Sequence, residues 1–264
     1  YGINDGDKTY AHRKEGQKNF LEFVDEPEDS IRWKREGIYG AYSYGPPEKR
    51  VSVILLDVRY FKESPDNILG EKQWKWLDET LGVAVRTSKV VMIGSGTQIL
   101  PANKPLSEKF GIKQRRKLLG LLQKHLGKKY VELGGGGERE VQGGGELPVV
   151  LLLSGDVHYA EILRLNCPLV TPSASSPSLS SPVYPVHEVT SSGLTHALGY
   201  HFSFSILKKL AISFINTTTR VVGQEYEDLN YGMLEIDWNA KPLTVKAEIW
   251  GIEGRALEYE VKSV

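Results

Sequence analysis

A run of apolar residues at positions 149–153 (VVLLL) lies between Pro148 and Gly155. A run of this length is too short to span a membrane and is typical of a strand buried in the centre of a sheet. Similar runs occur at 51–58 and 89–93, and each is followed by a polar loop and then by a helical pattern. This alternation of strand, loop and helix predicts an α/β fold.

Helical patterns, in which apolar residues recur at helical spacing, indicate amphipathic helices beside the strands. They cover residues 12–25, 69–81, 110–126 and 202–215. The third pattern is basic, and Arg115, Arg116 and Lys117 are predicted on its outward side. A basic run of this kind is a weak sign of nucleic-acid binding, so we interpret it as a solvated face of the helix.

The two ends of the chain contain alternating segments, which are typical of strands with one buried face. Residues 38–44 and 51–58 are joined by Gly45-Pro46-Pro47 and predict a hairpin. Residues 220–264 contain MLEIDW, LTVKAEIW and LEYEV, separated by turn residues. We expect these last segments to form an antiparallel sheet at an edge of the fold.

Two low-complexity segments interrupt this pattern at residues 134–145 and 168–182. They are rich in glycine, or in serine and proline, and such segments bury too little apolar surface to offset the entropy of ordering. We interpret both as flexible surface insertions within a single domain that covers residues 1–264.

Composition excludes several classes of protein. Lys and Arg number 33, and so do Asp and Glu, so no net charge favours a nucleic acid or a membrane surface. The single cysteine, Cys167, excludes an internal disulfide and a zinc site made of several cysteines. The sequence contains no apolar run of about 20 residues, so it predicts no transmembrane helix.

The sequence leaves the cellular compartment open. It starts at Tyr1 without a methionine or a signal peptide, so we expect it to be part of a longer protein. Asn216-Thr217-Thr218 is an N-glycosylation sequon, which is used only if the protein enters the secretory pathway.

The candidate chemistry follows the run at 149–153, where Gly155 is followed by Asp156 and His158. Ligands of α/β sheets bind beyond the carboxyl ends of the strands, and an aspartate with a neutral histidine suits Zn, Fe, Mn or similar ions. Asp156 and His158 could therefore reach one metal ion. The alternative, that Asp156 caps the next element and that His158 is a core histidine, is about equally favoured by these four residues alone.

Three further groups are candidates for a site. Asn4, Asp5 and Asp7 lie in a glycine-containing loop and either ligate a metal or form Asx turns, and turns are favoured. The planar guanidinium group of Arg59 could bind a phosphoryl group, but pairing of Arg59 with Asp57 is favoured. His196 follows Ser191, Ser192 and Thr195, which either reach the site or cap the helix predicted at 202–215, and capping is favoured.

Six segments in order along nearly the whole chain resemble the PhoD-like metallophosphatases, a branch of the calcineurin-like metallophosphoesterases. They are YGINDGD, VILLDVRYF, LGEKQWKWL, SGDVHYAEI, EVTSSGLTH and LNYGMLEIDW. The resemblance implies an αββα four-layer sandwich with a metal centre at the strand ends. It also implies hydrolysis of small-molecule phosphate monoesters or diesters with ions such as Fe, Ca, Zn or Mn.

The resemblance also assigns roles to residues. It implies that Asp156 and His158 are metal ligands, that Asn4 offers an amide oxygen to the same ions, and that Arg59 and His196 serve phosphate contact and proton handling. In that family the stretch like YGINDGD follows segments that carry further Asp ligands. We therefore expect this chain to hold only the later part of the fold and of the site.

Two other functions stay open. A metallophosphatase fold that lacks the earlier ligands could serve as a non-catalytic interaction domain. A hydrolase with Ser192 and His196 as nucleophile and base is less favoured, because the sequence has no Gly-x-Ser-x-Gly motif around Ser192.

Overall fold

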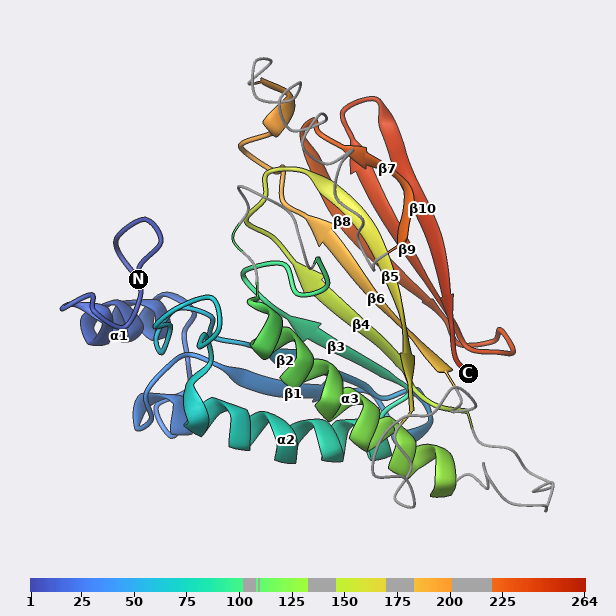
Figure 1. Ribbon diagram of the computed structural model, residues 1–264, viewed down its shortest axis with the longest axis horizontal. Helices are drawn as coiled ribbons and strands as arrows, with labels where there is room; N and C mark the ends of the chain where they lie inside the picture. The colour runs from blue at the N-terminus through green and yellow to red at the C-terminus, as the bar shows by residue number, and fades with distance from the viewer. Residues whose placement is uncertain (102–107, 109, 133–145, 170–182, 201–219) are drawn as a thin grey trace.

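The computed structural model describes residues 1–101, 108, 110–132, 146–169, 183–200 and 220–264 (Figure 1). The insertion at 134–145, the helix expected at 202–215 and the sequon at Asn216 lie outside these ranges. Most of the second insertion does too. Its first residues are described: Pro168 ends a strand and Leu169 is buried, so the expected boundary at 168 is too early.

A mixed sheet of seven strands forms the centre of the fold, in the order β1-β2-β3-β4-β6-β5-β7. β2, β3, β4 and β6 are parallel, whereas β1, β5 and β7 are antiparallel to their neighbours. The predicted central strand is confirmed, because β4 is the middle strand and Leu151 and Leu152 have no exposed surface. The strands are β1 (Gly40–Tyr44), β2 (Val51–Leu55), β3 (Val90–Gly94), β4 (Val149–Ser154), β5 (Ala160–Pro168), β6 (Val183–Ser191) and β7 (Arg220–Tyr226).

Two helices, α2 (Gly70–Thr87) and α3 (Ile112–Glu132), lie side by side on one face of this sheet (Figure 1). Leu77 and Leu118 pack with Ile54 and Leu152 in a single apolar core. Both helices confirm the predicted patterns. Arg115 corrects one detail: only 9% of its surface is exposed, because its position on α3 turns toward the core.

A second, antiparallel sheet covers the other face. It contains β8 (Asn230–Asp237), β9 (Thr244–Gly251) and β10 (Gly254–Lys262) in the order β10-β9-β8. Its buried residues Val245, Ala247 and Ile249 pack against apolar side chains of the large sheet, such as Val149 and Ile162. The antiparallel segments are thus confirmed. β7, from the same predicted range, is the edge strand of the large sheet, whereas β8, β9 and β10 form a separate layer.

The predicted α/β class is confirmed, and the layers observed are helices, large sheet and small sheet. The described residues thus supply three layers of the αββα sandwich, and the described part of the chain contains no helix over the outer face of the small sheet. That face carries ion pairs instead, since the buried Glu248 accepts hydrogen bonds from Arg255 and the indole of Trp250 and pairs with Lys246.

The N-terminal part contains α1 (Arg13–Phe23) and the short 3-10 helix η1 (Ile31–Trp33), which contact each other, and Arg32 of η1 donates to the Tyr42 hydroxyl on β1. Gln17 of α1 is buried and donates to the carbonyl oxygens of Arg32 and Arg35. The predicted helix and the hairpin of β1 and β2 are both confirmed. The remaining 3-10 helices are η2 (Pro47–Lys49), in the hairpin loop, and η3 (Leu198–Tyr200).

His187 of β6 lies between the two sheets. Only 3% of its surface is exposed, and its ring centroid is 5.3 Å from that of Tyr259 on β10. Neither ring nitrogen has a hydrogen-bond partner in the described structure. Burial lowers the pKa of His187 to about 4, and the charge of Arg164 acts in the same direction.

Candidate functional site

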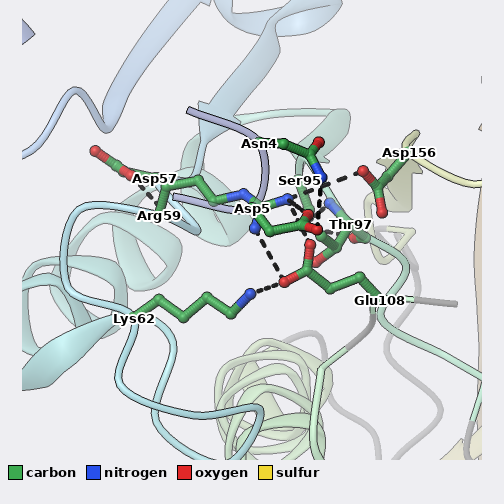
Figure 2. A network of polar contacts seen from close by, with 9 residues as sticks. All are labelled: Asn4, Asp5, Asp57, Arg59, Lys62, Ser95, Thr97, Glu108 and Asp156. Carbon is green, nitrogen blue, oxygen red and sulfur yellow. Dashed lines mark hydrogen bonds and ion pairs between the residues drawn. The ribbon is translucent and has the colours of Figure 1, made fainter. Parts of the chain in front are cut away.

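The carboxyl ends of β2, β3, β4 and β6 meet at one edge of the large sheet, as parallel strands require. The loops after these strands contain the residues singled out in the sequence. They are residues 56–60 after β2, 95–100 after β3, 155–158 after β4 and 192–196 after β6. The N-terminal loop with Asn4 and Asp5 lies at the same edge (Figure 2).

The turn after β4 has an unusual backbone. Asp156 and His158 both have positive φ, 76° and 60°, while Val157 between them is buried. With Val157 directed into the protein, its two neighbours are exposed. His158 is therefore not a core histidine, and this alternative is wrong. Asp156 and His158 are thus left-handed, whereas Gly155 does not have a positive φ.

Asp57, at the end of β2, is a structural carboxylate. It is 2% exposed, and its Oδ2 accepts hydrogen bonds from the Tyr1 hydroxyl and the Ile38 amide. Its Oδ1 accepts from the amides of Arg59 and Tyr60, each at 2.9 Å. Four donors occupy both oxygens, so Asp57 is not available to the guanidinium of Arg59. The favoured pairing of these two side chains is wrong.

The side chain of Arg59 instead joins three carboxylates (Figure 2). Its Nη1 donates to Glu108 Oε1 at 3.0 Å, and its Nη2 lies 3.4 Å from Asp5 Oδ1 and 3.9 Å from Asp156 Oδ1. Lys62 forms an ion pair with Glu108 as well. Loops after β2 and β4 and the N-terminal loop thus contribute to one charged network, which we call the Arg59 network.

Partial burial changes the proton affinity of this network. It raises the pKa of the Asp156 carboxyl, and Arg59 opposes the rise. Burial and the neighbouring charge of Arg59 lower the pKa of Lys62. Within the network, Arg59, Lys62 and Glu108 are therefore less solvated than Asp5, which is 62% exposed.

His196 lies near His158, with ring centroids 6.1 Å apart. Its Nδ1 is hydrogen-bonded to the Thr195 hydroxyl at 3.0 Å. The Ser192 hydroxyl accepts from the backbone N–H of His158 at 3.3 Å, so its hydrogen bond ties the loop after β6 to the turn after β4. Within the described residues no contact joins Ser192 to the His196 ring, which removes the support for a Ser/His hydrolase.

Asn4 is exposed and donates through Nδ2 to Asp5 Oδ2 at 2.9 Å. Asp7 forms the predicted Asx turn, because its Oδ1 accepts from the amide of Thr9 at 2.8 Å. The described residues contain no group of three or more His, Cys, Asp and Glu side chains placed to hold a metal ion. Asp156 and His158 with Asn4 therefore do not complete a metal site by themselves.

Several residues at this edge escaped the sequence analysis. Lys62, Gln98 and Glu108 lie outside the six segments, and Glu161 and Glu188 lie in two of them without a role of their own. Their contacts join residues far apart in the chain, such as Gln98 and Glu161. The available sign was a charged residue in the middle of a strand, as at Glu188 in β6.

No protein-family model matches the chain, and neither does any curated protein. Among solved structures it is similar to PhoD, with 15% identity and a TM-score of 0.40 over 86% of this chain and 44% of PhoD. It is also similar to a dimetal phosphatase from Danio rerio, with 11% identity and a TM-score of 0.34 over 85% of this chain and 60% of the phosphatase. The chain thus spans less than half the length of PhoD.

Proposed function

We propose that the protein containing this chain hydrolyses phosphate monoesters or diesters of small molecules at the carboxyl edge of the large sheet. The observation that supports this most is the convergence of Arg59 with Asp5 and Asp156, at 3.4 and 3.9 Å, in a partly buried network. A guanidinium is well suited to a phosphate because its planar fork matches two oxygens.

The roles of the side chains follow from these contacts. Arg59 and Lys62 would bind the phosphate oxygens, which for Arg59 would take the place of its contacts with Asp5 and Asp156. His196, held at Nδ1 by Thr195, would handle a proton through its other ring nitrogen. Glu108 would keep Arg59 and Lys62 together, since it pairs with both.

We also propose that Asp156 and His158 ligate a metal ion, with Asn4 as an additional donor and Fe, Ca, Zn or Mn as candidates. The remaining ligands would come from outside the described residues. When bound, such an ion would supply positive charge and a water of lowered pKa. The compartment and the use of the sequon at Asn216 stay predictions.

The test uses the full-length protein with p-nitrophenyl phosphate and its bis-ester, with and without added metal. Asp156→Ala and His158→Ala should each lower kcat/KM by at least about 100-fold, because loss of an outer metal-site partner alone costs up to about that much. Metal content by mass spectrometry should fall in parallel. Asp237→Asn, in an exposed turn of the small sheet, is the control and should change neither quantity.

A non-catalytic interaction domain is the second candidate. The lack of a group of three metal-ligating side chains among the described residues favours it. In that case the full-length protein would show no turnover of either ester with any of the four metals. Asp156→Ala would then leave both the metal content and the thermal stability unchanged.

A further inference from the structure

The loop after β3, residues 95–100, belongs to the same edge as Asp156. The amide of Ser95 donates to the carbonyl oxygen of Leu153 on β4 at 2.8 Å, which ties the loop to the strand that leads into the turn at 155–158. The Ser95 hydroxyl donates to the Thr97 carbonyl oxygen at 2.7 Å. Figure 2 includes Ser95 and Thr97 in the view of the Arg59 network.

The end of this loop rests on a buried carboxylate. Glu188 of β6 has no exposed surface, and its two oxygens accept hydrogen bonds from successive backbone amides. Oε1 accepts from Ile99 at 2.8 Å and Oε2 from Leu100 at 2.6 Å. A carboxylate that accepts hydrogen bonds from two successive backbone amides fixes both the position and the direction of that backbone segment.

The neighbouring side chain of the loop is held in the same manner. Gln98 has no exposed surface, and its Nε2 donates to Glu161 Oε1 at 2.6 Å and to Thr190 Oγ1 at 3.0 Å. The hydroxyl groups of Thr190 and Ser154 are 2.8 Å apart. Polar contacts therefore lead from Gln98 through β6 to the last residue of β4, next to the turn with Asp156.

Resting on the function proposed above, we propose that Glu188 is a positioning residue, which sets the place of the loop 95–100 against the turn 155–158 and thereby the geometry of the substrate site. Glu188 itself is too deeply buried to touch a substrate. It acts through Ile99 and Leu100, whose backbone it anchors, and it needs both carboxylate oxygens as acceptors.

The protonation of Glu188 gives this role a measurable signature. Burial raises its pKa to about 7, although the amides of Leu100 and Ile99 favour the charged form. The charged groups facing it are Glu161 on β5 and Arg115 on α3. On protonation one carboxylate oxygen becomes a hydroxyl. One of the two hydrogen bonds from the backbone amides of Ile99 and Leu100 is then lost, and the loop is less firmly held.

The experiment compares wild type with Glu188→Gln in the full-length protein. The glutamine keeps one acceptor but turns an NH2 group toward an amide donor, so amide hydrogen exchange at 98–100 should rise about tenfold. Exchange at 155–158 should rise as well, and kcat with bis-p-nitrophenyl phosphate should fall about tenfold. The wild-type kcat should also contain an acid limb near pH 7 that the variant lacks.

Glu248→Gln is the control, because Glu248 is also a hydrogen-bonded carboxylate in the middle of a strand but lies on the outer face of the small sheet, away from the loop 95–100. It should leave loop exchange and kcat within about twofold of wild type. If Glu188→Gln does not fold, Glu188→Asp replaces it. This variant keeps the charge but reaches only one amide, so its exchange and kcat should be intermediate.

Unchanged exchange at 98–100 and 155–158 in the Glu188 variants would overturn the proposal. So would faster exchange with the same kcat, KM and pH profile as wild type, since Glu188 would then be only structural. If wild type has no turnover, the proposed function fails and the exchange at 155–158 alone decides: a rise there supports the positioning role.

Discussion

The guanidinium of Arg59 and the carboxylate of Asp156 face each other at the edge of the large sheet, with Nη2 3.9 Å from Oδ1. The two side chains are 21% and 33% exposed. An ion pair with this exposure contributes at most about 1 kcal/mol to stability. Either side chain can therefore exchange this ion pair for a bound ion at a low cost in stability. For the proposed function, Arg59 would bind an anion and Asp156 would bind a metal ion.

Replacing Arg59 tests the anion-binding half of this relationship. Arg59→Lys keeps the charge but loses the planar fork, so KM for a phosphate ester should rise by roughly tenfold while kcat changes less. Steady-state kinetics of the full-length protein measure both constants. Arg255→Lys, on the small sheet, is the control. Equal KM values for Arg59→Lys and wild type would show that Arg59 does not bind the substrate.

Replacing Asp57 tests its structural role. In Asp57→Asn an NH2 group must face either the Tyr1 and Ile38 donors or those of Arg59 and Tyr60, so unfolding free energy should fall by about 2–3 kcal/mol. Urea denaturation measures this change. Asp237→Asn is a fitting control, because Asp237 also accepts two backbone amides but in an exposed turn. A loss of less than about 0.5 kcal/mol for Asp57→Asn would contradict the assignment.

His187 should make the fold sensitive to acid. Its folded-state pKa, about 4, lies below the usual 6.5. Its contribution to stability is therefore present above pH 6.5 and is lost as the pH falls toward 4. His187→Phe fills a similar volume without two unpaired ring nitrogens, and should stabilise by about 1–2 kcal/mol at pH 7.5 and by more at pH 5. Chemical denaturation at the two pH values is the measurement, and a destabilised variant at both would refute the prediction.

Glu188 should have the opposite pH dependence. Its pKa is raised from 4.5 to about 7. Its contribution to the free energy of unfolding is therefore fully present below pH 4.5 and is lost as the pH rises through 7. The stability of wild type relative to Glu188→Gln should fall by up to roughly 3 kcal/mol between pH 4.5 and 8. This pH range overlaps the range in which His187 changes stability. Denaturation curves of both Glu188→Gln and His187→Phe are therefore needed. A constant difference between wild type and Glu188→Gln would show that Glu188 has an ordinary pKa.

The sequence predicted the elements that depend on local pattern. The run at 149–153 gave the central strand β4, and the spacing of Trp76, Leu77 and Leu81 gave α2, because burial of apolar side chains decides both. It could not show that β8, β9 and β10 form a separate sheet. The same alternation suits a strand at the edge of the large sheet and a strand in a second layer.

The site was predicted in part. Asp156, His158 and Arg59 follow strands whose carboxyl ends share one edge, and this rule placed them correctly at that edge. The partner of Arg59 could not be predicted, because a turn of the backbone directs Asp57 to the amides behind it. Lys62, Glu108 and Glu188 were missed since their roles depend on contacts between distant segments, which a single sequence does not reveal.

The positive φ values at Asp156 and His158 have a consequence for engineering this turn. A residue with a side chain in the left-handed conformation costs of order 1 kcal/mol or more, and glycine avoids this steric cost. Asp156→Gly or His158→Gly should therefore relieve the backbone. On the function proposed above, each change would also remove a metal ligand, so stabilising designs should leave this turn unaltered.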